Sequence, residues 1–184
     1  MKKSHRTTFS HKILSGGLRK IAVAAFLSAL SIVCGKYLAI NAGPVMRFSF
    51  ENLPILFAGV VLGPVWGALV GAVADLIGCV LVGYAINPVV TLGAILVGLG
   101  GGVAYRVAPR LPHAVRLSLG VLTGHLLGSV LVKTWGLSVF YDMPFYVLLL
   151  WRLLNYAIVG GVEFSLLYFL LKNKAVRRLC EVLR

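Results

Sequence analysis

Acidic side chains are scarce in this chain: five Asp and Glu residues stand against 18 Lys and Arg residues in 184 positions. Charged residues of both signs make up only 12% of the sequence, whereas hydrophobic residues make up 59% and the mean hydropathy is +0.94. So few polar side chains cannot cover a surface in water, but a surface against lipid tails needs no such cover. The composition excludes an ordinary soluble domain and predicts an integral membrane protein.

Sequence patterns that carry catalytic chemistry are also missing. The chain has no Gly-x-Ser-x-Gly, no His-Glu-x-x-His and no glycine-rich phosphate loop followed by Lys-Ser or Lys-Thr. Its three cysteines, Cys34, Cys79 and Cys180, share no metal-ligand spacing. Two of them lie inside apolar runs, where cysteine usually packs as a small apolar residue. We therefore expect no enzymatic activity, no metal and no cofactor.

The net charge of +13 does not indicate nucleic-acid binding, because the basic residues flank apolar runs and form no recognition motif. They gather at both ends of the chain and in one interior gap that holds Arg106, Arg110 and Arg116. Basic clusters in such places are topology signals and contacts for anionic lipid. Membrane lipid is therefore an expected partner, and nucleic acid is not.

The apolar runs are continuous and do not alternate with polar residues, which favours α-helices over a β-barrel. Six spans are predicted, the second of them short, at about residues 18–40, 52–62, 64–82, 89–105, 115–137 and 145–171. The expected architecture is an all-α six-helix transmembrane domain over residues 18–174, with a basic lead-in (1–17) and a basic tail (175–184). Six spans place both termini and the basic interior gap on one side, which the positive-inside rule makes the cytoplasm.

One polar segment breaks the apolar pattern: residues 47–54 read Arg-Phe-Ser-Phe-Glu-Asn-Leu-Pro. The predicted topology places this segment on the outer side, where Arg47 and Glu51 could pair with each other or contact a ligand. The outer half of the bundle also supplies amides, aromatic rings and cations: Asn52, Asn87, Asn155, Phe50, Tyr84, Tyr141, Trp151, Lys133 and Arg152.

An ionisable residue inside a membrane span is costly and is a functional-site hypothesis by default. Arg152 lies about two turns into the last span, and Asn155 and Tyr156 follow at spacings of three and four residues. These spacings place the three side chains on one helix face. A cation, an amide and a phenol on one buried face favour a binding role for Arg152.

Other polar residues within the spans leave two interpretations open. Lys36 and Lys133 either extend to the outer interface or contact a ligand. His125 either packs against a neighbouring carbonyl or contacts the ligand. Asp75 and Glu163 are either structural partners, for Arg152 among others, or functional groups.

These motifs resemble those of the substrate-binding S components of energy-coupling factor (ECF) vitamin transporters, and the folate type in particular. The general features are the Asn-Leu-Pro entry at residues 52–54 and the Gly63-Pro64 break. The features that point to folate are the segment at 47–52, the Tyr-x-Ile-Asn-Pro turn at 84–88, and the Arg152-x-x-Asn155-Tyr156 element.

The resemblance implies a multi-pass protein of a bacterial plasma membrane that captures its vitamin from outside with high affinity. It also implies partners: one transmembrane coupling protein and two cytoplasmic ATPases that hydrolyse ATP on its behalf. In this family the docking face includes small residues of the first helix, here Ala22, Ala25 and Ala29. Their spacing alone is equally consistent with close packing inside the bundle.

Folate combines a flat pterin, a second aromatic ring and a glutamate tail with two carboxylates. Its pocket needs amides or carboxylates for the pterin edge, aromatic rings for stacking, and cations for the tail. We expect Arg152 or Arg47 to meet the carboxylates, and Asn87 or Glu51 to contact the pterin. The full candidate set is Arg47, Phe50, Glu51, Asn52, Tyr84, Asn87, His125, Lys133, Tyr141, Trp151, Arg152 and Asn155. The alternative functions are an S component for another vitamin or precursor, a stand-alone proton-coupled permease, and a structural membrane protein.

Overall fold

The computed structural model describes the backbone of residues 4–42 and 46–183, and the side chains of 17–40, 48–140 and 142–183. The first helix, α1 (Ser4–Ile32), begins within the predicted lead-in (1–17). At its other end it continues as a π-helical segment, η1 (Val33–Tyr37). Two short strands, β1 (Ile40–Ala42) and β2 (Met46–Phe48), pair antiparallel, with Ile40 opposite Phe48. The rest of the described chain is helical, so the all-α prediction holds apart from this small hairpin.

The remaining helices follow the predicted order. The second and third are α2 (Asn52–Val61) and α3 (Pro64–Leu81), and the fourth is α4 (Pro88–Val107). One long helix is built from α5 (His113–Gly124), the π-helical η2 (His125–Val132) and α6 (Lys133–Tyr141). The chain ends in α7 (Phe145–Lys172) and a short α8 (Lys174–Leu183).

Local sequence explains where two of these helices begin. Gly63 has a φ of 123°, a conformation that favours glycine, and with Pro64 it separates α2 from α3. Asn87 caps α4: its Oδ1 accepts hydrogen bonds from the backbone N–H groups of Val89 (3.0 Å) and Val90 (3.4 Å). Pro88 then occupies the first turn, where the missing N–H costs no hydrogen bond.

In the described part of the chain, five helical segments are long and apolar enough to cross a membrane. They are Gly17–Tyr37, Pro64–Leu81, Pro88–Val107, His113–Phe140 and Phe145–Lys172. The second predicted span, 52–62, corresponds to α2, but this helix has only 10 residues. At 1.5 Å per residue it is about 15 Å long, half of a typical 30 Å hydrocarbon core. The prediction of a sixth span is therefore not confirmed: most of α2 is buried, and it lies inside the bundle.

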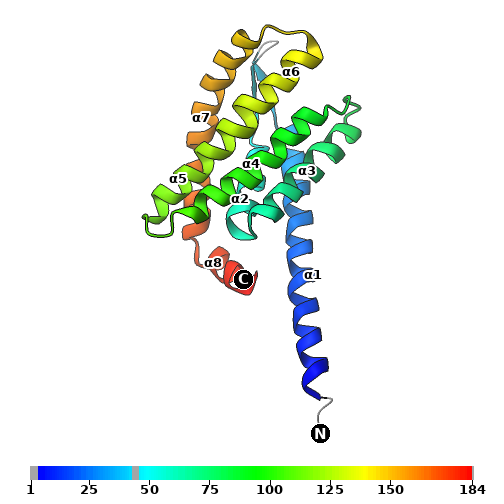
Figure 1. Cartoon of the computed structure of the whole chain (residues 1–184), viewed down its shortest axis with the longest axis vertical. Helices are drawn as coiled ribbons and strands as arrows, with labels where there is room; N and C mark the ends of the chain where they lie inside the picture. Colours follow the sequence, from blue (N-terminus) through cyan, green and yellow to red (C-terminus); the bar gives the residue numbers. More distant parts are fainter. Residues whose placement is uncertain (1–3, 43–45, 184) are drawn as a thin grey trace.

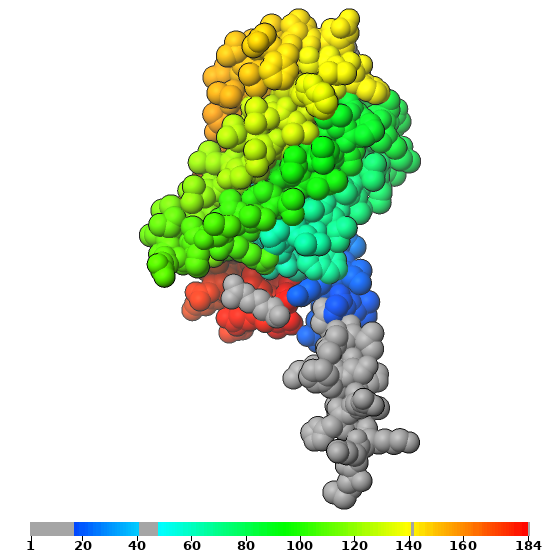
Figure 2. Space-filling model, in the orientation of Figure 1, coloured from blue at the N-terminus to red at the C-terminus, as the bar shows by residue number. Residues whose placement is uncertain are grey.

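The connections alternate between the two ends of the bundle (Figure 1). The α3–α4 and α6–α7 turns lie at the end drawn uppermost. The α2–α3 and α4–α5 turns lie at the opposite end, where α8 and the N-terminal part of α1 are also found. Figure 2 shows α8, in red, beneath the bundle beside the part of α1 that is drawn in blue, which begins at residue 17. The basic gap at 106–116 is thus at the same end as α8.

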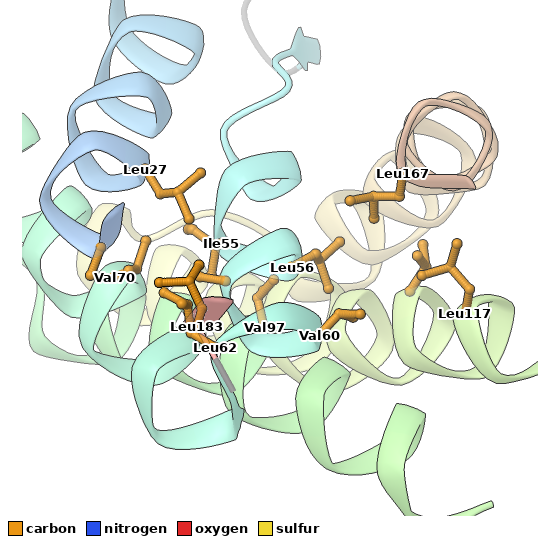
Figure 3. Packing of buried hydrophobic residues seen from close by; sticks show 13 residues of the cluster. Leu27, Ile55, Leu56, Val60, Leu62, Val70, Val97, Leu117, Leu167 and Leu183 are labelled. Atoms are coloured by element: carbon orange, nitrogen blue, oxygen red, sulfur yellow. The ribbon is translucent and has the colours of Figure 1, made fainter. Parts of the chain in front are cut away.

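The apolar core lies where α2 meets its neighbours (Figure 3). Leu56 of α2, Val97 of α4, Leu117 of α5 and Leu167 of α7 are completely inaccessible to solvent. Ile55 of α2 extends the cluster toward α1. A short inner helix surrounded by longer ones therefore organises the packing of the bundle.

Glycines allow α3 and α4 to approach closely. A Cβ atom placed on Gly98 of α4 would overlap the carbonyl group of Gly67 in α3, and one on Gly71 would overlap the carbonyl of Ala94. Small residues at such crossings let helix backbones come into contact within the membrane.

We expect Gly98→Ala to lower stability by about 1–3 kcal/mol, because the added methyl group has to displace backbone atoms. Thermal unfolding of the purified protein in detergent measures this loss. Gly161→Ala is the matched control, since nothing lies within 4 Å of that position. Equal midpoints for the two variants would contradict the close crossing of α3 and α4.

Candidate functional site

A polar cavity of about 260 Å³ opens at the end of the bundle that carries the α3–α4 turn. This volume lies just below the roughly 300–1,000 Å³ typical of small-molecule sites. Its wall is formed by η1, α3, α4, α6 and α7, together with the segment before α2 and the α3–α4 turn. The lining residues are Lys36, Ser49, Glu51, Asp75, Cys79, Tyr84, Ala85, Asn87, Val90, Lys133, Leu137, Arg152, Asn155 and Tyr156. The wall thus contains three cations, two carboxylates, two amides and two phenols.

A buried ion pair joins the two sides of this cavity. Lys133 Nζ lies 2.8 Å from Glu51 Oε1, and Lys133 is only 3% exposed. Lys133 therefore does not extend to the outer interface, which excludes that interpretation. Glu51, at the start of α2, has Lys133 as a partner. The side chain of Arg47, the other partner considered for Glu51, lies outside the described residues.

The other two cations of the cavity have aromatic neighbours. Lys36 Nζ lies 5.4 Å from the centre of the Tyr84 ring, and the guanidinium carbon of Arg152 lies 5.6 Å from the centre of the Tyr156 ring. Arg152 also donates a hydrogen bond from Nε to the backbone oxygen of Ser129, at 3.1 Å. Within the described part of the chain, neither Lys36 nor Arg152 forms an ion pair. Their charges remain available to an anionic ligand.

Hydrogen-bonding groups lie on the same wall. Asp75 Oδ2 accepts a hydrogen bond from Thr91 Oγ1 at 2.6 Å, which fixes this carboxylate at the middle of α3. Asn155, on α7, is buried and lines the cavity one turn from Arg152. A carboxylate and an amide so placed can recognise the donors and acceptors at the edge of a planar heterocycle.

Asn87 has a structural task in addition to lining the cavity. Its Oδ1 caps α4, and its Nδ2 donates to the backbone oxygen of Gly136 at 3.0 Å, which ties the α3–α4 turn to α6. One N–H of this amide then remains for a ligand. Asn87 thus holds the mouth of the cavity together.

Of the predicted binding residues, six line the cavity: Glu51, Tyr84, Asn87, Lys133, Arg152 and Asn155. Four described candidates do not line it. Asn52 is fully buried and donates from Nδ2 to Ser129 Oγ at 3.2 Å, while Phe50 and Trp151 lie at the surface. His125 lies deeper in the bundle. The side chains of Arg47 and Tyr141 lie outside the described residues.

Besides Ser49, the sequence-based candidate set left out three polar residues of the cavity wall, Lys36, Asp75 and Tyr156. Each had been recognised as polar within or at the end of an apolar span. A polar residue within an apolar span was therefore a sufficient signal to identify them. The sequence did not show that they lie close to the segment at 47–54 in the folded protein.

A second buried pair lies below the cavity. His125 Nε2 and Glu163 Oε2 are 2.6 Å apart, and the two side chains are 6% and 0% exposed. The His125 ring also packs against Tyr156, with 5.0 Å between ring centres. Glu163 is therefore the partner of His125, and Asp75 that of Thr91; neither carboxylate pairs with Arg152.

The three alanines predicted to dock a partner are all exposed on α1. Ala22 also borders an apolar groove of about 430 Å³, formed with Phe26 of α1, Phe57 of α2, Leu170 of α7 and Leu179 of α8. Exposure argues against close packing of these alanines inside the bundle. Docking of a partner at this face remains a prediction.

The family model for the ECF transporter, substrate-specific component, matches residues 19–171. The chain belongs to this family. Its members are substrate-binding subunits of membrane transporters and not enzymes, and the S component described here is accordingly a membrane-embedded transport protein. The match covers α2 to α6 completely and all of α7 except its last residue, Lys172, and ends before α8.

Among curated proteins, this S component is similar to the folate transporter FolT of Clostridium novyi (strain NT). The two are 28% identical over 145 residues, which is 78% of this chain and 83% of that protein. Among solved structures, it is similar to FolT bound with folic acid, with a TM-score of 0.70, 26% identity, and coverage of 86% of this chain and 97% of that one. The S component for biotin shares the fold alone, with a TM-score of 0.63 and 17% identity over 85% of this chain and 93% of that one.

We expect Glu163→Ala to destabilise this S component by roughly 3–5 kcal/mol, because it leaves His125 buried without its partner. Glu163→Gln keeps a hydrogen-bonding group in place and should lose less. Thermal unfolding in a single detergent compares both with Glu181→Gln, which neutralises an exposed carboxylate on α8. An unfolding midpoint for Glu163→Ala equal to that of the unmodified protein would show that the pair does not stabilise the fold.

Proposed function

We propose that this chain is the folate-binding S component of an ECF transporter, and that it captures the vitamin in the cavity next to Lys36 and Arg152. The observation that carries the proposal is the charge of that cavity. Lys36 and Arg152 line it without an ion pair among the described residues, while Lys133 is already neutralised by Glu51. The two free cations match the two carboxylates of a glutamate tail.

The rest of the cavity suits the aromatic part of such a ligand. Tyr84, in the α3–α4 turn, and Tyr156, in α7, each contribute an aromatic ring to the wall. Asp75 contributes a hydrogen-bond acceptor and Asn155 an amide. A pterin has donors and acceptors along one edge, so a carboxylate and an amide can each pair with it. The similarity to two proteins named for folate supports this choice over another vitamin.

The topology that accompanies this proposal has six passes, with both termini in the cytoplasm. The alternating turns of the bundle support it, as does the location of the basic 106–116 gap at the same end as α8. The positive-inside rule assigns that end to the cytoplasm. The cavity then opens at the outer face.

Delivery of the ligand requires partners. The proposed partners are one transmembrane coupling protein and two cytoplasmic ATPases, and the exposed alanine face of α1 is the proposed contact for the coupling protein. An exposed row of small residues supports this assignment, because it allows another helix to approach closely.

Replacing either free cation should weaken folate binding. We expect Arg152→Gln and Lys36→Gln each to raise the Kd by roughly 10- to 150-fold, the range for losing a hydrogen bond to a charged group. Isothermal titration of folate into the purified protein measures the change. Arg110→Gln, in the exposed α4–α5 turn, is the control and should bind as the unmodified protein does. Unchanged affinity in both cavity variants would rule out the proposed site.

Transport by this chain alone should not occur. In liposomes with an imposed proton gradient, we expect the purified protein to bind folate but to accumulate none until the coupling protein, the two ATPases and ATP are added. Radiolabelled folate uptake measures this. Uptake driven by the gradient without these partners would instead establish a stand-alone permease.

A further inference from the structure

A second polar cleft lies at the opposite end of the bundle from the ligand cavity. It has a volume of about 630 Å³ and lies between the start of α5, the end of α7 and α8. Two tyrosines, a histidine and two cations line it: Tyr105, His113, Tyr168, Lys172 and Arg177. The ligand cavity shares none of these residues, so this cleft has to be explained separately.

Three aromatic rings form a continuous series along the cleft. The Tyr105 and His113 rings meet edge to face, with 5.9 Å between their centres. The His113 and Tyr168 ring centres are 6.2 Å apart. The series bridges α4, α5 and α7, so it is assembled by the tertiary fold and not by one helix.

A cation lies beside each end of this aromatic series. The Arg116 guanidinium lies 4.3 Å from the centre of the Tyr105 ring and is held there by a hydrogen bond from its Nε to the Tyr105 backbone oxygen, at 2.9 Å. Lys172 Nζ lies 6.0 Å from the centre of the Tyr168 ring. Cations fixed over aromatic faces are pre-oriented and retain N–H donors for an anion.

The charge of the cleft is positive. Arg177 of α8 adds a further cation to the wall, and Glu181 adds one carboxylate. Among the described residues, none of Arg116, Lys172 and Arg177 forms an ion pair. The cations therefore outnumber the carboxylate, and no ion pair within the described part of the chain neutralises them.

The cleft also lies at the level of lipid headgroups. Tyr105 and Lys172 lie at the ends of apolar helices that span Pro88–Val107 and Phe145–Lys172, and His113 begins the span that continues to Phe140. Residues at the ends of such spans occupy the membrane–water interface, where tyrosines and basic residues are favoured. Leu171 and Ala114 give the cleft an apolar border against the acyl chains.

From this placement we propose that the cleft between α5, α7 and α8 binds the phosphodiester headgroup of an anionic phospholipid. The Lys172 and Arg177 side chains contact the phosphate, while the ring series forms the floor and Arg116 lies against its Tyr105 end. Basic pockets between membrane helices bind anionic headgroups by this combination of charge and depth. Arg177 belongs to α8, which lies beyond the residues matched by the family model, so this chain supplies part of the site from outside the shared S-component region.

Native mass spectrometry of the detergent-purified full chain tests this proposal, with short-chain phosphatidylglycerol as the anionic probe and phosphatidylcholine as the zwitterionic one. We expect phosphatidylglycerol to bind more tightly. The double variant Lys172→Gln/Arg177→Gln should lose roughly 30-fold of that affinity, since each basic residue near an anionic headgroup contributes about fivefold. Lys172→Arg/Arg177→Lys should retain it.

Lys174→Gln/Arg178→Gln is the matched control, because it removes the same two charges from exposed residues of α8 that do not line the cleft. Equal affinity for the two lipids, or an equal loss in the control and the double variant, would overturn the proposal in favour of diffuse charge attraction. Displacement of phosphatidylglycerol by an equal concentration of inorganic phosphate would assign the site to a free anion instead. Folate binding should be unchanged in all of these variants, because none of the substituted residues lines the ligand cavity. Failure of the lipid proposal would therefore not bear on the proposed folate site.

Discussion

Lipid cannot solvate a charge, so an ionisable side chain within the spans is costly unless it has a partner inside the bundle. This constraint accounts for the arrangement of the polar residues. Lys133 pairs with Glu51, His125 with Glu163, and Thr91 donates to Asp75. Each of these contacts joins two different helices or a helix and the segment before α2. The polar contacts therefore link neighbouring helices, while the apolar core around Leu56 fills the space between them.

The same constraint separates the groups that stabilise the fold from those available to a ligand. A cation whose charge is cancelled by a neighbour contributes mainly to the structure of the wall, whereas one that lacks a counter-ion is costly until an anion arrives. Lys133 is of the first kind, and Lys36 and Arg152, which have no counter-ion among the described residues, are of the second. Binding an anionic ligand would then relieve an electrostatic cost already present in the empty protein.

Much of the fold could be predicted from the sequence because lipid imposes long, continuous apolar runs. Gly63-Pro64 and Asn87-Pro88 marked helix boundaries correctly, since both act through local backbone geometry. The short length of α2 was visible too, but its burial was not, because an apolar helix inside a bundle has the same composition as one facing lipid. The partners of the buried charged residues were the hardest to predict. Glu51 and Lys133 are 82 residues apart, and the sequence around neither residue indicates that the two form a pair.

The π-helical segment η2 sets the direction in which Lys133 points from the wall of the ligand cavity. A π-helical stretch accommodates an extra residue within an otherwise α-helical segment, and η2 begins at His125 and ends directly before Lys133. Each residue of an α-helix advances the side chain by about 100°, so deletion of one residue from η2 would rotate all of α6 by that amount. Lys133 would then leave Glu51 and face a neighbouring helix or the lipid. The length of this segment keeps the cation in the cavity, so insertions and deletions there are restricted as well as substitutions.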